Sequence, residues 1–177
     1  MDLNQTEIII IISIVAILIY VYTTHRDDDG RVKDSSVDTD NVLESIEKFE
    51  PKLNSNLKDG YTEKSIQNQL KKHLQEEYVS VIDEYGIEGA NGTKIDFDIG
   101  NGKVGLELKL AKSLFKKSNE HRLIGQIDDY MGRKYDNDNL IVAVYGEKQH
   151  TRERARLNEI RKKVESKNAI FTYIEIS

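Results

Sequence analysis

The stretch from Lys94 to Leu110, KIDFDIGNGKVGLELKL, restricts the fold more than any other part of the chain. It holds two runs in which apolar and polar residues alternate, and Asn101 and Gly102 join them. An Asn-Gly pair between alternating runs is the strongest short-range signal of a β-hairpin with a two-residue type I′ turn. The sequence therefore predicts an antiparallel pair of strands here.

The predicted turn sets which residues face each other across the hairpin. Asp98 then lies opposite Gly105, and Asp96 lies opposite Glu107, with Cβ atoms about 5 Å apart. Lys109, two residues beyond Glu107, points to the same face. The other face is apolar and is expected to be buried as a unit. It pairs Ile95, Phe97 and Ile99 with Leu108, Leu106 and Val104.

The polar face of this hairpin combines two carboxylates and an ammonium. Two carboxylates this close repel each other unless a shared proton or a cation compensates their charge. Mg²⁺ prefers one or two carboxylates, with waters and substrate phosphate oxygens as its other ligands. The alternative is a solvated polar face, because mixed charges on an exposed hairpin need no function. The context favours a cation site, since the second strand leads into a strand–helix–strand unit and is expected to be central.

The remaining periodicity predicts an α/β fold. Ile66, Leu70 and Leu74 share one side of a helix at 62–77, and a strand at 78–85 follows it. After the hairpin come a helical stretch at 113–134, an apolar strand at 140–145, a basic helix at 151–166 and a last strand at 169–176. Short turns make the first three strands antiparallel, and a right-handed crossover makes the next pair parallel. The result is a mixed sheet with helices on both sides.

The amino terminus is the most apolar part of the chain. Ile8 to Tyr22 carries no charge, and extended through Thr24 it reaches the lower limit of about 17 residues for a transmembrane helix. A cleaved signal peptide is disfavoured, because no Lys or Arg precedes the run and no cleavage site follows it. A buried core helix is disfavoured by so uniform a β-branched run at a terminus. The sequence predicts a single-pass membrane anchor at residues 1–24.

Residues 25–60 are expected to form an acidic linker with a short helix at 41–50, and residues 61–177 the folded domain. Arg26, Arg31 and Lys33 follow the apolar run, so the positive-inside rule predicts a cytoplasmic location for the domain. A formal net charge of -5 argues against a protein that only coats nucleic acid. The absence of cysteine excludes a disulfide framework or a thiolate metal site. The sequence also lacks a Gly-rich phosphate loop and an arrangement typical of serine hydrolases.

Asp96 followed by a hairpin and then Glu107-Leu108-Lys109 resembles the PD-(D/E)xK nuclease superfamily, which has the restriction-endonuclease-like fold. The proline that often precedes the aspartate in that family is replaced here by Ile95. The predicted order, α-β-β-β-α-β plus a C-terminal helix and strand, is similar to the family core. Roughly residues 61–146 take part in the resemblance.

Three further residues extend the resemblance. Gln126 and Tyr130 resemble the QxxxY element that one branch of the superfamily carries on the helix after its motif. Glu63 stands on the opening helix, where many members have an additional acidic ligand. Two of these residues have plain structural alternatives. Glu63 would also serve as a first-turn acid beside the helix dipole, and Tyr130 as a core tyrosine with a satisfied hydroxyl.

The resemblance implies metal-dependent hydrolysis of nucleic acid, with DNA favoured over RNA. Asp96, Glu107 and Glu63 would hold Mg²⁺ or Mn²⁺, and Lys109 would orient the attacking water. Gln126 and Tyr130 would position nucleic acid or support the ligands. Contacts to backbone phosphates would come from basic residues that flank the motif in sequence. These are Lys112, Lys116, Lys117, Arg122, Arg133 and Lys134.

Several alternatives stay open at this point. Asp98 competes with Asp96 as first ligand, although its diagonal position, about 7 to 8 Å from Glu107, favours Asp96. The domain as a whole would also suit an inactive module of the same fold that binds nucleic acid or a protein partner at the membrane. A structural membrane protein that merely resembles the fold is the third hypothesis.

Overall fold

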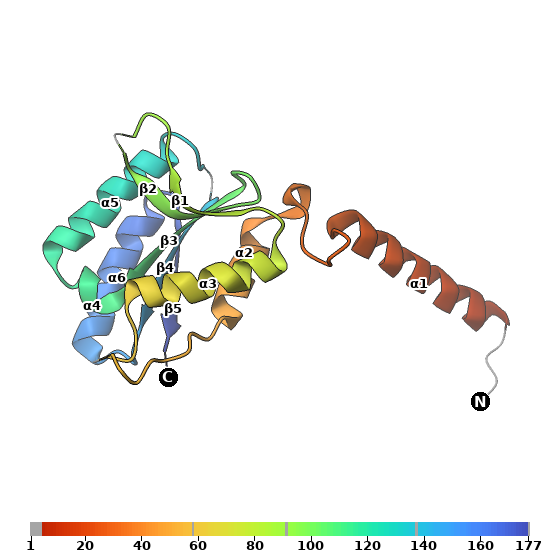
Figure 1. Ribbon diagram of the computed structural model, residues 1–177, viewed down its shortest axis with the longest axis horizontal. Helices are drawn as coiled ribbons and strands as arrows, with labels where there is room; N and C mark the ends of the chain where they lie inside the picture. Colours follow the sequence, from red (N-terminus) through yellow and green to blue (C-terminus); the bar gives the residue numbers. More distant parts are fainter. Residues whose placement is uncertain (1–4, 58, 91, 137, 177) are drawn as a thin grey trace.

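A five-stranded mixed sheet forms the centre of the protein (Figure 1). The computed structural model describes residues 5–57, 59–90, 92–136 and 138–176. The spatial order of the strands follows the sequence, and their directions agree with the predicted α/β fold. The first three are antiparallel: β1 (Val81–Gly86), β2 (Lys94–Ile99) and β3 (Val104–Leu110). The last two join in parallel: β4 (Leu140–Gly146) and β5 (Ile170–Glu175).

Helices cover both faces of this sheet, so each face has its own core (Figure 1). One face packs against α2 (Thr39–Lys48) and α3 (Glu63–Glu77). The other packs against α4 (Ala111–Leu114), α5 (Lys117–Met131) and α6 (Thr151–Glu165). Because both faces are covered, β3 and β4 are buried along their whole length. This burial confirms the prediction that the second hairpin strand is central.

The helix α2 belongs to the core of the domain. The sequence placed this segment within the linker at 25–60, but Val42 and Ile46 are fully buried against the sheet. The Phe49 ring lies 5.3 Å from the His73 ring of α3, measured between centroids. The helix begins after Asp38, whose side chain accepts the N–H of Asn41. The α/β domain therefore starts before residue 61 and includes the short helix.

The chain between α1 (Gln5–His25) and α2 also follows a defined path. The sequence predicted an acidic linker here. In the structure, the N–H of Val32 donates to the Glu77 carbonyl at 2.7 Å, and Val32 bridges to Tyr78. A short 3₁₀ helix, Asp34–Ser36, follows, and Ser80 donates to Asp34 at 2.8 Å. These contacts attach the segment to the carboxyl end of α3.

Replacing Ile46 with Ala tests whether α2 stabilises the domain. Ile46 is fully buried, so its truncation is expected to lower the free energy of unfolding by about 2 to 4 kcal/mol. The exposed Glu44→Ala on the same helix serves as control and is expected to leave the free energy of unfolding nearly unchanged. Urea unfolding followed by circular dichroism measures both. Equal effects of the two changes would contradict a structural role for α2.

The helix α1 extends away from the sheet and its covering helices (Figure 1). Large apolar side chains between Ile10 and Tyr22 are exposed along it. In the part of the chain that the structure describes, no helix combines the length and the apolar character needed to cross a membrane. Residues 1–4 of the expected anchor lie outside the described residues. The anchor stays a prediction from the sequence.

The hairpin has the predicted register in the half nearest its turn. Phe97, Asp98 and Ile99 pair with Leu106, Gly105 and Val104 respectively. Asn101 and Gly102 have φ angles of 54° and 91°, positive at both positions as a type I′ turn requires, but Gly100 is also left-handed, with a φ of 66°. The connection therefore spans residues 100–103 instead of two residues, whereas the Asn-Gly signal predicted the hairpin and this pairing correctly.

The other half of the hairpin departs from the prediction of one continuous apolar face. Ile95 packs in the core beside α5, whereas Phe97 packs in the core beside α3, although residues two apart normally share a face. In the neighbouring strand, Glu84 has a φ of 50°, a left-handed conformation that turns the strand over at this point. Asp83 accordingly pairs with Lys71 of α3, while Tyr85 packs on the opposite side. The predicted facing of Ile95 and Leu108 was wrong for this reason.

Candidate functional site

The predicted acidic residues meet in an open groove where β2 separates from β3. The groove has a volume of about 470 Å³ and lies between the start of α3 and the middle of α5. Asp96 comes from β2, Glu107 and Lys109 from β3, and Glu63 from the first residue of α3. The structure thus brings together the four charged residues that the sequence singled out. The rest of the lining consists of Gly92, Thr93, Lys94, Arg122 and Gln126.

The ammonium of Lys109 lies at the centre of this group. Its Nζ is 2.5 Å from Oε1 of Glu107 and 2.9 Å from the carbonyl oxygen of Leu108. Carboxylate oxygens of Glu63 and Asp96 lie 3.8 and 3.9 Å away. Burial by itself would lower the pKa of Lys109, but the charges of Glu107, Asp96 and Glu63 outweigh it and raise the pKa. Lys109 therefore remains charged, and four oxygens surround one cation.

Asp96 is held by two donors and carries a perturbed pKa. Its Oδ2 accepts the backbone N–H of Leu108 at 2.7 Å, and its Oδ1 accepts Nε2 of Gln67 at 3.1 Å. The three β2–β3 pairs end at Phe97, so Asp96 contacts the edge of β3 through its side chain. Burial, followed by the charge of Glu107, raises the pKa of Asp96 to about 7. At neutral pH Asp96 is therefore partly protonated, and a cation bound at its oxygens would favour the ionised carboxylate.

Gln126 and Tyr130 of α5 both reach the site. The Tyr130 hydroxyl lies 3.0 Å from Oε2 of Glu107 and 2.6 Å from the carbonyl oxygen of Lys94. Gln126 donates to that hydroxyl from Nε2 at 3.2 Å. Burial, helped by the charge of Glu107, raises the pKa of Tyr130 far above its ordinary value, so the hydroxyl stays a neutral donor. The two residues support the carboxylate that Lys109 also contacts.

The buried carboxylate of Asp98 lies outside the groove. It accepts the Tyr135 hydroxyl at 2.5 Å and pairs with Lys134 at 3.0 Å. The ammonium of Lys134 also lies 3.4 Å from the centroid of the Tyr85 ring. Asp98 is therefore a structural residue, which agrees with the preference for Asp96. Lys134, predicted to contact nucleic acid, pairs with this buried carboxylate outside the groove.

The other predicted phosphate contacts are spread over the surface. Arg122 is exposed and lines the groove itself. Lys116 and Lys117 are exposed at the start of α5. Lys112 pairs with Asp59 and lines a different cavity, of about 260 Å³. Arg133 is exposed beyond the end of α5, 4.0 Å from Asp129.

Sequence reasoning missed three residues of this region. Gln67 is buried beside Asp96. Two exposed lysines are also in this region: Lys64 lies on α3, and Lys94 lies at the start of β2. Gln67 was detectable in principle, because it is a polar residue one helical turn after Glu63 on the buried side of α3. Lys64 and Lys94 have no distinguishing sequence signal, since exposed lysines are common on any surface.

The donor atoms of the groove fit a hard divalent cation. Among the described residues, no group of three or more Asp, Glu or His side chains has the arrangement of a formed metal site. The ammonium of Lys109 lies where these oxygens converge. The atoms around it are nevertheless all oxygens, from Asp96, Glu107, Glu63 and the Leu108 carbonyl, and Mg²⁺ prefers such ligands.

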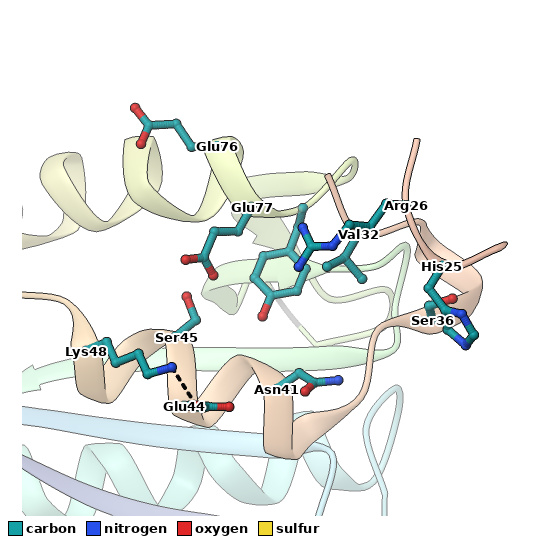
Figure 2. Close-up of a pocket in the computed structure, with 11 residues that line it drawn as sticks. His25, Arg26, Val32, Ser36, Asn41, Glu44, Ser45, Lys48, Glu76 and Glu77 are labelled. Carbon is teal, nitrogen blue, oxygen red and sulfur yellow. Dashed lines mark hydrogen bonds and ion pairs between the residues drawn. The ribbon is translucent and has the colours of Figure 1, made fainter. Parts of the chain in front are cut away.

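A second polar cavity, of about 400 Å³, lies at the carboxyl end of α3 (Figure 2). Its carboxylates are much more solvated, since the side chains of Glu44 and Glu77 are 62% and 41% exposed. Lys48 pairs with Glu44 within α2 (Figure 2). Solvated charges of this kind need no added cation. The groove at Asp96 is therefore the stronger candidate site.

Oxygens suited to bind a cation lie in the groove close to the ammonium of Lys109. The exposed guanidinium of Arg122 lines the same groove. Such a combination suits an oxyanion with several oxygens, such as a phosphate diester. Comparison with models of known protein families, with curated proteins and with solved structures found no match to this chain.

Proposed function

We propose that this protein is a metal-dependent nuclease of the PD-(D/E)xK type, which hydrolyses phosphodiester bonds with DNA as the favoured substrate. The observation that supports the proposal is the convergence of oxygens from Asp96, Glu107, Glu63 and Leu108 on the ammonium of Lys109. These residues follow the order of the family motif. The contact of Tyr130 with Glu107 gives the QxxxY element a matching role.

The residues of the groove would have different roles in phosphodiester hydrolysis. Asp96, Glu107 and the Leu108 carbonyl would hold Mg²⁺ or Mn²⁺, with Glu63 at the rim. When bound, the ion would polarise a phosphoryl oxygen and lower the pKa of a water molecule. Lys109 would leave Glu107, orient the attacking water and offset negative charge on the phosphate. Tyr130 keeps Glu107 in place.

Arg122 is the groove residue best placed to bind the substrate strand. It is exposed on α5, on the same wall of the groove as Gln126. A guanidinium can donate two parallel hydrogen bonds to one phosphate, which suits it to a backbone contact. Lys64 and Lys94, on the opposite side, would add electrostatic attraction that weakens with salt.

Incubation of the full chain with linear and circular DNA and with RNA tests the proposal. Cleavage is expected with Mg²⁺ or Mn²⁺ and is expected to stop with a chelator. Glu107→Gln is expected to abolish it, because the change removes a ligand charge from the groove. Glu44→Gln, at the exposed and distant α2 position, serves as the matched control and is expected to cleave like the wild type.

Two results would contradict the nuclease assignment. Equal cleavage by the wild type and Glu107→Gln would mean that the activity comes from another protein in the sample. No cleavage of any substrate would favour the alternative, an inactive module of the same fold that binds nucleic acid or a protein. A gel-shift measurement with the same DNA and RNA then tests that alternative.

A further inference from the structure

The buried side of α3 contains one amide among apolar side chains. Gln67 is 7% exposed, and its helical neighbours Ile66 and Leu70 are fully buried. Burying an amide costs roughly 1 to 3 kcal/mol unless hydrogen bonds satisfy it. An apolar residue would fill this position without that cost. The contacts of the amide therefore indicate why a glutamine stands here.

Both ends of the Gln67 amide are engaged. Its Nε2 donates to Oδ1 of Asp96 at 3.1 Å, and its Oε1 accepts Nζ of Lys64 at 3.1 Å. A lysine ammonium has donors and no acceptor, so the oxygen of the amide must face Lys64. The NH₂ group must then face Asp96. The neighbouring lysine thus determines the orientation of the amide.

Asp96 is restrained from two directions as a result. The Leu108 N–H, from β3, holds Oδ2, and the Gln67 amide, from α3, holds Oδ1. Two donors on different oxygens prevent rotation of the carboxylate about its last bond. Oδ2 also lies 3.9 Å from Nζ of Lys109, at the place where the oxygens converge. The restraint therefore directs the carboxylate toward the position for a cation.

Glu84 extends this chain of contacts to the left-handed residue of β1. Its Oε1 lies 2.8 Å from Nζ of Lys64, and its φ is 50°. A non-glycine residue in this conformation costs about 1 kcal/mol or more, and such residues cluster at functional sites. The ion pair is more than half exposed and contributes little stability. Its effect is to keep Lys64 beside Gln67.

We propose that Gln67 is a positioning residue for Asp96, whose amide, oriented by Lys64, fixes the carboxylate toward the cation position beside Lys109. The inference rests on the proposed function, because it gives Gln67 a role in a cation centre. It adds a residue of α3 that acts on the site through Asp96.

Mn²⁺ binding by the full chain tests this role without relying on cleavage. Gln67→Met keeps the length and packing of the side chain and removes both hydrogen bonds. It is expected to weaken Mn²⁺ binding about tenfold or more, the usual effect of losing a group that orients a ligand. Isothermal titration calorimetry at pH 8 measures the affinity, and thermal unfolding confirms that the variant folds. Gln67→Ala is the second variant if Gln67→Met does not fold.

Gln69→Met is the matched control. Gln69 lies on the same helix, and its amide bonds the N–H and the carbonyl of Lys52 at 2.8 and 3.1 Å, away from the groove. The control is expected to lose similar hydrogen bonds and to bind Mn²⁺ within twofold of the wild type. Binding by Gln67→Met within twofold of the wild type would overturn the inference and leave the nuclease proposal standing.

The remaining outcomes separate the two proposals. A wild type that binds Mn²⁺, with weaker binding by Gln67→Met and no cleavage of any nucleic acid, would support the role of Gln67 and contradict the nuclease. A wild type that does not bind Mn²⁺ would overturn both, since Gln67 would have no cation centre to serve.

Discussion

Lys109→Met is expected to lower cleavage by about 100- to 1,000-fold while making Mn²⁺ binding tighter. The ammonium lies among the oxygens of Glu107, Asp96 and Glu63, so it competes with a divalent ion for the same oxygens. Without it, the carboxylates attract the ion more strongly, by about tenfold or more in affinity. The water and the phosphate lose the cation that orients and neutralises them. Calorimetry and single-turnover cleavage measure the two effects.

Two control variants test whether the opposite changes in cleavage and Mn²⁺ affinity are specific to Lys109. Glu107→Gln removes a ligand and is expected to weaken both Mn²⁺ binding and cleavage. Lys71→Met removes an ion pair with Asp83 outside the groove and is expected to change neither. Weaker Mn²⁺ binding by Lys109→Met would show that the ammonium does not compete with the ion for these oxygens.

Asp96→Asn is expected to stabilise the metal-free protein at pH 8, although it removes a ligand. Burial and Glu107 raise the pKa of Asp96 from 3.8 to about 7. Between these values the folded chain keeps a proton that the unfolded chain has lost, so stability falls as pH rises through this window. Above about pH 7 the folded chain has also lost this proton, and the decrease in the free energy of unfolding is complete. The asparagine avoids this loss of about 4 kcal/mol. Its NH₂ group, however, meets one of the two donors, the Leu108 N–H or the Gln67 amide, at a cost of about 2 kcal/mol, so a net gain of about 2 kcal/mol is expected at pH 8.

Urea unfolding at pH 4.5 and pH 8, without divalent cations, measures this gain. The advantage of Asp96→Asn is expected to be small at pH 4.5 and large at pH 8. Asp83→Asn is a control of opposite sign, because the hydrogen bond from Lys71 lowers the pKa of Asp83. Its stability is therefore expected to fall relative to the wild type at pH 8. If Asp96→Asn were less stable than the wild type at pH 8, the hypothesis that the ionised Asp96 destabilises the metal-free protein would be wrong.

Much of the fold could be predicted from local patterns. The Asn-Gly turn predicted the pairs nearest it, and the apolar run at 140–145 predicted a strand covered on both sides. The helix at 62–77 and the last helix and strand lie within a few residues of their predicted bounds. Each of these signals depends on residues close in sequence, where the strand and helix periods can be read directly.

Other parts of the fold depend on distant contacts that local patterns do not contain. The short helix after Asp38 has too few residues to show which surface covers it, and the sheet buries it through Val42 and Ile46. The left-handed residue Glu84 carries no turn signal, because its conformation is imposed where β1 and β2 change sides. Ile95 was therefore assigned to the wrong face.

The residues of the candidate site also fall into those that the sequence could place and those that only the tertiary structure could place. The sequence by itself determined that Asp96, Glu107 and Lys109 stand on adjacent strands, because they lie on the two arms of a hairpin; the predicted pairing of Asp96 with Glu107 is absent from the strand ladder. Only the tertiary structure decided that Glu63 and Gln67 of α3 and Tyr130 of α5 join them from opposite faces of the sheet. Those contacts require β2 to separate from β3 on the N-terminal side of Phe97, which opens the sheet to both helix layers. Sequence periodicity describes one element at a time, whereas this groove forms where four elements, β2, β3, α3 and α5, meet.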